Sequence, residues 1–323
     1  MDPSSKEIVF EVADFKVYKD GQVERASSAL DTVPAGFDAD TGVTSRDVVI
    51  DAATGVAARL YLPTIKTSAS SSETVINSSA MTNKLPVVVF FHGGYFIVGS
   101  PWHPNYHHYV NSLAAGASVV AVSVDYRLAP EHLLPAAALN WVASGADTWL
   151  SDHGDLGRIF VVGVSAGANI AHNVAMAAGV IGLQASMAPT CIKGVVLLHP
   201  SFAAEEKMEA ENKEFLRANR VRWEVIFPDA KGGLDDPRIN PMAAAAPSLA
   251  KLPGERLLVC TASGDPRASR GRAYRDALQA SGWRGKVQWF ESENEGHCFF
   301  VPNHGGREAV KLMDRVVRFL AGL

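Results

Sequence analysis

The sequence has few cysteines, no excess of basic residues and no long apolar run. Its three cysteines, Cys191, Cys260 and Cys298, are far apart, which predicts reduced thiols rather than a disulfide framework. A formal net charge of -4 provides no basic surface for nucleic acid or anionic lipid. No run approaches the roughly 20 apolar residues that span a bilayer, and residues 1–10 lack the apolar core of a signal peptide. We therefore expect a cytoplasmic protein whose partners are small molecules, not nucleic acid or membranes.

Hydrophobic residues, by contrast, are abundant enough for a large core, at 47% of the 323 residues. Continuous apolar runs are typical of strands that are buried on both faces of a parallel sheet. Strands and helices are predicted to alternate along most of the chain, which indicates one α/β domain over residues 1–323, with helices on both faces of a mostly parallel sheet. The predicted strands are 47–50, 57–62, 85–91, 118–124, 158–164, 192–198, 256–260 and 286–290. The predicted helices are 133–150, 166–179, 269–281 and the segment from residue 307.

Three segments stand apart from this alternation. Residues 1–45 mix acidic, basic and turn residues, and the charged stretch from residue 203 to 222 interrupts the pattern. Residues 64–83 are rich in serine and without periodicity, so we predict a mobile surface loop there. In the last helix, apolar residues at helical spacing predict a face packed on the core: Val310, Met313, Val317 and Leu320.

The segment from Arg158 to His172 predicts a nucleophile elbow. A β-branched run leads into Gly163-Val164-Ser165-Ala166-Gly167 and then into an alanine-rich helix. Ser165 is expected at the tip of a tight turn, with glycines on either side where larger side chains would collide with the strand and the helix. A serine hydroxyl becomes a nucleophile only with a base beside it and donors facing the developing oxyanion. The elbow therefore needs partners elsewhere in the chain.

Those partners follow three other predicted strands. His92-Gly93-Gly94-Tyr95-Phe96 can bring backbone N–H groups close to a ligand, so we assign Gly93, Gly94 and the Tyr95 backbone to an oxyanion hole that the N–H of Ala166 completes. Asp265 follows the strand 256–260, and His297 follows the strand 286–290. The chain order Ser165, Asp265, His297 is the order of an α/β-hydrolase triad, with the histidine as base and the aspartate as its orienting acid.

With these motifs, the sequence resembles the plant carboxylesterases of the hormone-sensitive-lipase class of α/β-hydrolases. The resemblance extends over about residues 10–320 and includes further short motifs: Val124 to His132, Leu198 to Phe202, Asp236-Pro237, Asn240-Pro241, Ser281 to Trp283 and Asn294 to His297. It implies an α/β-hydrolase fold and a helical lid built from about residues 1–45 and 203–249. It also implies that residues 125–132 support the oxyanion loop from beneath, with their charged residues tied into a buried network rather than taking part in the chemistry.

Two positions depart from the pattern of that family. Tyr95 stands where a third glycine or another small residue is usual, and Val164 stands where an aspartate is usual. A backbone N–H survives either change, so the oxyanion hole itself can persist. We expect Tyr95, Phe96 and Val164 to line a narrower and more apolar pocket for the acyl or alcohol group.

Several other polar residues are expected to play structural roles. His103, His107 and His108 lack cysteine or carboxylate neighbours at metal-ligand spacing, so we predict no metal site there. His172 lies two helical turns beyond Ser165 and is expected to pack in the core, and Cys298 is expected to be a buried neighbour of His297. No cofactor is expected.

We therefore predict a serine carboxylesterase that hydrolyses esters of small, mostly apolar molecules through an acyl-enzyme. Two alternatives remain, since the resembling proteins include 2-hydroxyisoflavanone dehydratases, which perform elimination or cyclisation, and gibberellin receptors, which bind a ligand without a complete triad. Ser165 favours the esterase over the lyase, and His297 argues against a receptor. Residue types indicate neither the natural substrate nor the oligomeric state.

Overall fold

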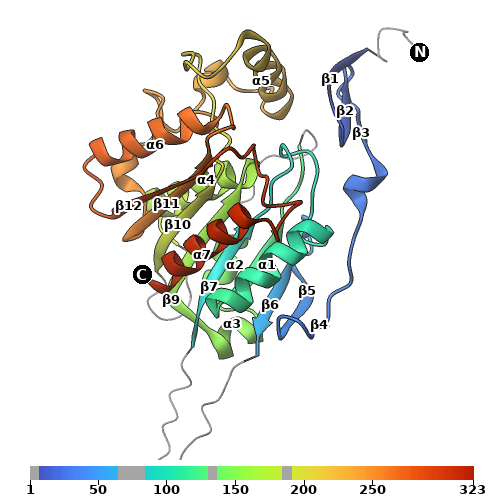
Figure 1. Cartoon of the computed structure of the whole chain (residues 1–323), viewed down its shortest axis with the longest axis vertical. Coiled ribbons are helices and arrows are strands. Elements are labelled where there is room, and N and C mark those ends of the chain that lie inside the picture. Colours follow the sequence, from blue (N-terminus) through green and yellow to red (C-terminus); the bar gives the residue numbers. More distant parts are fainter. Residues whose placement is uncertain (1–6, 65–83, 130–136, 184–190) are drawn as a thin grey trace, which may run out of the picture.

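The computed structural model describes residues 7–64, 84–129, 137–183 and 191–323. Within these ranges a nine-stranded sheet has the order β12-β11-β10-β9-β7-β8-β6-β5-β4 (Figure 1). The strands from β12 through β8 in this order pair in parallel, whereas β6, β5 and β4 pair antiparallel at one edge. The strands are β4 (Phe37–Asp38), β5 (Val43–Asp51), β6 (Val56–Pro63), β7 (Leu85–Phe91), β8 (Val120–Asp125), β9 (Gly154–Val164), β10 (Ile192–Leu198), β11 (Arg256–Ala262) and β12 (Lys286–Ser292).

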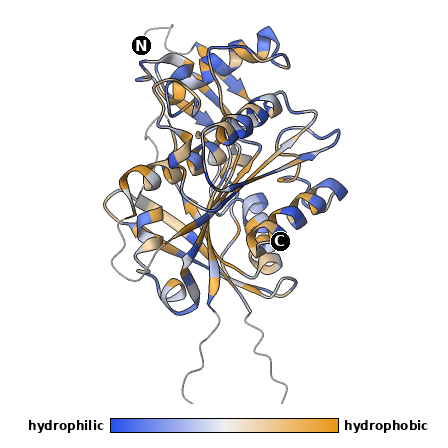
Figure 2. Cartoon of the chain, turned by 90° about the vertical axis from the view of Figure 1, so that its left-hand side faces the viewer, coloured by the Kyte–Doolittle hydropathy of each residue, from blue (hydrophilic) through white to orange (hydrophobic). Residues whose placement is uncertain are grey.

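Helices cover both faces of this sheet because alternate residues of each buried strand point to opposite sides. On β7, Val87, Val89 and Phe91 join one core cluster, and Val88 and Phe90 join the other. The first cluster includes side chains of α2 (Ala137–Ala143), α3 (Thr148–His153), α4 (Ala166–Ile181) and α6 (Ala268–Ala280). The second includes side chains of α1 (Pro104–Ala117) and α7 (Arg307–Ala321). In Figure 2 the hydrophobic colour follows the strands through the centre of the molecule.

A smaller layer lies beyond the carboxyl ends of the parallel strands, and we call it the cap (Figure 1). It consists of a three-stranded antiparallel sheet near the N-terminus and of residues 203–249. The sheet contains β1 (Ile8–Val12), β2 (Phe15–Tyr18) and β3 (Val23–Arg25), followed by the turn η2 (Ser27–Leu30). The second part contains α5 (Lys213–Ile226) and η3 (Gly233–Asp235), and η4 (Leu249–Lys251) leads back to β11. The β1 strand and α5 contact each other.

The predicted α/β-hydrolase architecture is confirmed, and the two strands predicted at 85–91 and 192–198 have those bounds in the structure. The helix predicted at 133–150 is wrong. Residues 130–136 lie outside the described ranges, and the remainder forms the two short helices α2 and α3. Gly145, with a φ of 63°, and Asp147, which caps the start of α3 through its side chain, separate them.

The cap corresponds to the predicted helical lid, but it is only partly helical. Its N-terminal part is β-sheet and ends before Phe37. The later residues of the range 1–45 that was predicted as lid, namely β4 and the start of β5, belong to the central sheet. The predicted mobile loop at 64–83 lies, apart from Thr64, outside the described residues. Among the described helices, none combines the length and apolar character that a membrane span requires.

The buried face of α7 also differs from the prediction. Val310 is 56% exposed, whereas Leu320 is buried and Met313 and Val317 are partly buried against the core. The fully buried stripe consists of Ala309, Leu312, Val316, Phe319 and Leu320. Val310 therefore lies at the solvent side of a stripe that is rotated from the one predicted.

Candidate active site

Ser165 lies at the tip of a strained turn between β9 and α4. Its φ is 53° and its ψ is -113°, a conformation that non-glycine residues rarely adopt. A Cβ atom on Gly163 would lie 2.0 Å from the carbonyl oxygen of Gly167, and one on Gly167 would lie 2.1 Å from that of Phe91. Both glycines are therefore sterically required. The geometry is that of the predicted nucleophile elbow.

Ser165, His297 and Asp265 form a continuous hydrogen-bonded chain. The Oγ of Ser165 lies 2.7 Å from Nε2 of His297, and Nδ1 of His297 lies 2.5 Å from Oδ2 of Asp265. Asp265 follows β11, His297 follows β12, and both segments reach the carboxyl edge of the sheet where Ser165 lies. The histidine is 132 positions from the serine and 32 from the aspartate in sequence, so only the order of the strands brings the three together.

The electrostatics of this chain favour a neutral histidine that can act as a base. Burial lowers the pKa of His297 to about 4, and the positive charge of Arg267 acts in the same direction, although the bond to Asp265 opposes both. Burial by itself raises the pKa of Asp265, but its contacts with His199 and His297 and the charge of Arg267 lower it by more, so this pKa is below its usual range. At neutral pH an ionised Asp265 therefore accepts a hydrogen bond from the Nδ1–H of His297, which leaves Nε2 free to accept one from the hydroxyl of Ser165.

The predicted oxyanion loop turns back beside Ser165. A Cβ on Gly93 would lie 3.3 Å from the Cβ of Ser165, and Gly94 has a φ of 116° with its carbonyl accepting from the N–H groups of Ile97 and Val98. Tyr95 and Phe96 then have φ angles of 59° and 67°. This run of left-handed residues reverses the chain close to the first turn of α4, whose free N–H groups begin at Ala166.

Two side chains, one directly after β8 and one from the cap, bond to backbone carbonyls of this loop. Tyr126 donates its hydroxyl proton to the carbonyl of His92 at 2.9 Å and stacks on the His92 ring at a centroid distance of 4.2 Å. Arg25, from β3, donates to the carbonyl of Ile97 at 2.7 Å. The support predicted from residues 125–132 is thus seen at Tyr126. The network of charged residues stays a prediction, because Glu131 and His132 lie outside the described residues.

The three residues predicted to line the pocket have different environments. Tyr95 borders a cavity of about 150 Å³ between the cap and the loops of the site. Phe96 is 3% exposed. Its ring packs on Trp223 of α5 and on Phe227, which directly follows that helix. Val164 is fully buried in the core cluster beneath α1 and α7. The assignment of Val164 to a pocket wall is therefore corrected, because alternation along β9 directs its side chain into the core.

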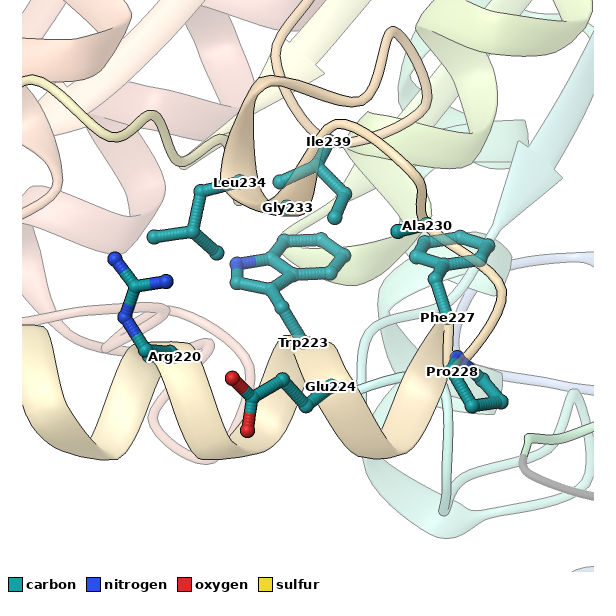
Figure 3. Close-up of a pocket in the computed structure, with 9 residues that line it drawn as sticks. All are labelled: Arg220, Trp223, Glu224, Phe227, Pro228, Ala230, Gly233, Leu234 and Ile239. Carbon is teal, nitrogen blue, oxygen red and sulfur yellow. The ribbon is translucent and has the colours of Figure 1, made fainter.

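A second cavity, of about 260 Å³, lies within the cap (Figure 3). Trp223 and Phe227 face Leu234 and Ile239 across it, and Arg220 lies at one side. The lining contains none of the triad residues. Phe96 of the oxyanion loop packs on Trp223 of this cavity wall, so an aromatic contact joins the loop to the cavity lining.

Two residues near the triad have no role in the sequence-based prediction. Nδ1 of His199 accepts from the N–H of Cys298 at 3.1 Å and lies 3.7 Å from Oδ2 of Asp265. Nη1 of Arg267 lies 3.6 Å from the other carboxylate oxygen of Asp265. His199 occurs in one of the family motifs, which is a usable signal, whereas Arg267 offers none beyond its position two residues after Asp265.

The residues expected to be structural have structural contacts. Nδ1 of His107 lies within hydrogen-bond distance of Arg59 and Tyr61, and His103 caps the start of α1. His172 is buried and bonds to the hydroxyl of Tyr274 at 2.9 Å. Burial raises the pKa of the Cys298 thiol, which opposes a role as a second nucleophile.

Residues 88–301 match a protein family that is defined by the alpha/beta hydrolase fold. The chain belongs to this family, in its hormone-sensitive-lipase class, and is an esterase-like hydrolase. Tuliposide A-converting enzyme b1 of Tulipa gesneriana is 39% identical over 95% of this chain and 78% of its own length. The 2-hydroxyisoflavanone dehydratase of Glycyrrhiza echinata is 37% identical over 98% and 97%, and probable carboxylesterase 3 of Arabidopsis thaliana is 34% identical over 94% and 95%.

Solved structures of esterases have the same fold. The esterase LipW from Mycobacterium marinum superposes with a TM-score of 0.69 at 25% identity, covering 88% of this chain and 83% of that one. An esterase from Pyrobaculum calidifontis gives a TM-score of 0.67 at 25% identity, covering 91% and 87%.

Proposed function

We propose that this protein hydrolyses carboxylic esters of small, mostly apolar molecules, with Ser165 as the nucleophile. The observation that carries the proposal is the hydrogen-bonded chain from Ser165 through His297 to Asp265, with distances of 2.7 and 2.5 Å. Membership of an esterase-like family supports it. The substrate itself is the protein's expected partner, and no cofactor takes part in the steps below.

In the first half of the reaction, Ser165 Oγ bonds to the carbonyl carbon of the ester while its proton passes to Nε2 of His297. Asp265 stabilises the imidazolium that forms. The tetrahedral intermediate then expels the alcohol, which takes the proton from His297, and leaves the acyl group on Ser165. Water attacks this acyl-enzyme with His297 again as base, which releases the acid and restores the serine.

Backbone N–H groups of Gly93, Gly94, Tyr95 and Ala166 are proposed to hold the oxyanion of both tetrahedral intermediates. Donors fixed in place stabilise this charge without reorganisation, and the loss of one donor costs about 10²- to 10³-fold in kcat. The positive φ angles of Gly94 and Tyr95 and the start of α4 at Ala166 support this assignment. Tyr95 and Phe96 are proposed to shape the adjoining pocket.

The test is hydrolysis of p-nitrophenyl esters from acetate to octanoate by the wild type, Ser165→Ala and His297→Ala. Turnover by the wild type that both variants lose supports the proposal. The acyl chain length with the highest turnover indicates the size of the acyl pocket. Circular dichroism must first show that each variant is folded. Absence of turnover on every ester, or equal turnover in Ser165→Ala, contradicts the proposal.

A dehydratase-type elimination is the second candidate, because a 2-hydroxyisoflavanone dehydratase is 37% identical over nearly the whole chain. A base and oxyanion donors serve elimination as well as hydrolysis, whereas the serine nucleophile favours hydrolysis. Loss of water from a 2-hydroxyisoflavanone, followed by absorbance, distinguishes the two: elimination without ester hydrolysis favours the lyase. Specific binding of a ligand such as gibberellin without any turnover favours the receptor alternative.

A cytosolic location remains part of the proposal. The tuliposide A-converting relative is described as amyloplastic, which makes the plastid the specific competitor. A fluorescent fusion of the full chain in plant cells decides between diffuse cytosolic signal and signal within plastids.

A further inference from the structure

Two arginine side chains border the cavity of about 150 Å³ beside the oxyanion loop. Arg222 comes from α5 in the cap, and Arg267 comes from the loop between Asp265 and α6. The remaining wall is formed by Tyr95 and by residues of β1 and α5: Phe10, Glu11, Val12, Phe215, Ala218 and Asn219. The cavity therefore lies where both parts of the cap meet the loops that hold the proposed triad.

Arg222 is a buried cation without an anionic partner. It is 3% exposed, and among the described residues no carboxylate forms an ion pair with it. One guanidinium nitrogen donates to Oδ1 of Asn219, and the guanidinium lies over the rings of Tyr95 and Trp223 at 5.6 and 4.9 Å. Its buried Nε has no acceptor within the part of the chain that the structure describes. A buried charge with so few partners is unfavourable.

Arg267 increases this local excess of positive charge. Its contact with Asp265 is long, at 3.6 Å, and Asp265 is already bonded to His297. Its buried Nε also finds no acceptor among the described residues. Burial and the charge of Arg267 lower the pKa of Arg222 to about 9, which reflects how poorly this cation is compensated.

The one acidic side chain in the cavity wall does not neutralise the pair. Glu11 is exposed, and its carboxylate lies 3.5 Å from Nζ of Lys16 on the neighbouring strand. Guanidinium groups bind carboxylates through two parallel hydrogen bonds, and such bonds are stronger than those between neutral groups. A carboxylate in this cavity would offer both buried Nε atoms an acceptor and would give Arg222 the opposite charge that it lacks.

We propose that Arg222 and Arg267 bind a carboxylate of the substrate, so that the preferred ester is apolar in its body and anionic at one end. This inference rests on the proposed esterase function, because it assigns an additional group to the substrate of the same site. The cavity size suits a carboxylate with a short segment of chain, and Tyr95 links it to the oxyanion loop.

The test measures binding apart from turnover. Ser165→Ala is titrated calorimetrically with 4-phenylbutyrate and with its neutral amide, 4-phenylbutyramide. We expect the carboxylate to bind at least about 10-fold more tightly than the amide, because only the carboxylate is anionic. Adding Arg222→Met should abolish this preference, and adding Arg222→Lys should retain part of it. Equal binding of acid and amide overturns the inference.

Arg217→Gln provides the matched control, because Arg217 lies on the same helix, is exposed and carries the same charge. It should leave the preference unchanged, and an equal loss in Arg217→Gln would assign the effect to net charge and overturn the site. If Arg222→Met does not fold, Arg267→Gln must reduce the preference instead. Retention of the full preference in folded Arg267→Gln then overturns the inference.

Turnover on paired esters separates this inference from the proposed function. The wild type is assayed with 4-nitrophenyl hydrogen glutarate and 4-acetoxybenzoate, each against its neutral methyl ester. Hydrolysis of neutral and anionic esters with no carboxylate preference in either binding or turnover leaves the esterase in place and overturns the anion site. Tight carboxylate binding that depends on Arg222, without hydrolysis of any ester, supports the anion site and contradicts the esterase.

Discussion

The carboxyl edge of the sheet and the cap hold their functional side chains in different ways. At the edge of the sheet, backbone sterics fix Ser165, because the glycines on either side of it approach neighbouring carbonyls too closely for any side chain. In the cap, packed side chains fix the positions of Trp223 and Arg222, and cavities of about 260 and 150 Å³ lie beside them. We infer that the sheet determines the type of reaction and that the cap determines the choice of substrate.

The largest effect is expected from the triad. Ser165→Ala or His297→Ala should lower kcat by about 10⁴-fold or more, since the serine and its base act as a unit. Steady-state kinetics on the best p-nitrophenyl ester measures the loss. His304→Ala is the control, because His304 is exposed and stacks on His108 rather than on a triad residue, and it should retain nearly full activity. A loss under about 10-fold in His297→Ala would remove its role as base.

The glycines of the elbow should come next. Gly163→Ala places a Cβ 2.0 Å from a backbone oxygen, so we expect destabilisation of about 4 kcal/mol or more, or failure to fold. Urea denaturation measures the free energy of unfolding. Gly305→Ala serves as the control and should change stability little, because its φ is not positive and no atom lies within 4 Å of the place that a Cβ would take.

Tyr95→Gly tests the contact between the oxyanion loop and the cap, and a smaller effect is expected. Glycine tolerates the φ of 59°, so the backbone of the oxyanion loop should persist, while the ring that contacts Phe10 and Phe15 is lost. We expect a shift of the preferred acyl chain toward longer esters, with kcat/KM on acetate changed by less than about 10-fold. An unaltered ester preference would show that Tyr95 does not shape the pocket.

The smallest effect is a change in pH dependence. With the pKa of His297 at about 4, kcat/KM should fall only when the pH drops toward that value, rather than near 6.5. Arg267→Gln should move the acid limb to higher pH, because removal of a neighbouring positive charge favours protonation of the imidazole. Since the folded protein binds fewer protons at His297 than the unfolded chain, the stability from this group should also decrease as the pH falls from about 6.5 to 4.

Sequence-based prediction succeeded where the backbone geometry requires a recognisable residue pattern. The strands at 85–91 and 192–198 are continuous apolar runs, and the elbow requires glycine at 163 and 167. The order of Ser165, Asp265 and His297 predicted the hydrogen-bonded chain because the ends of parallel strands meet at one edge.

Prediction failed where tertiary packing decided the outcome. The buried stripe of α7 is rotated so that Val310 faces solvent. The helix expected at 133–150 failed for a local reason instead, because Gly145 and the cap at Asp147 separate α2 from α3. Side chains of β9 alternate between the two faces of the sheet, and Val164 lies on the face that packs into the core. No local sequence pattern predicts that Arg222 and Arg267 line the same cavity. The two residues are far apart in sequence and come together only because α5 packs over the loop after β11.

Labelling with a fluorophosphonate reports directly on whether Ser165 is activated, because such reagents phosphonylate a serine that has a base beside it. The proposed serine mechanism predicts a single adduct on the peptide containing Ser165, located by mass spectrometry, with labelling lost in Ser165→Ala and greatly slowed in His297→Ala. Labelling of another residue, or no labelling of Ser165 in the folded wild type, would contradict that mechanism.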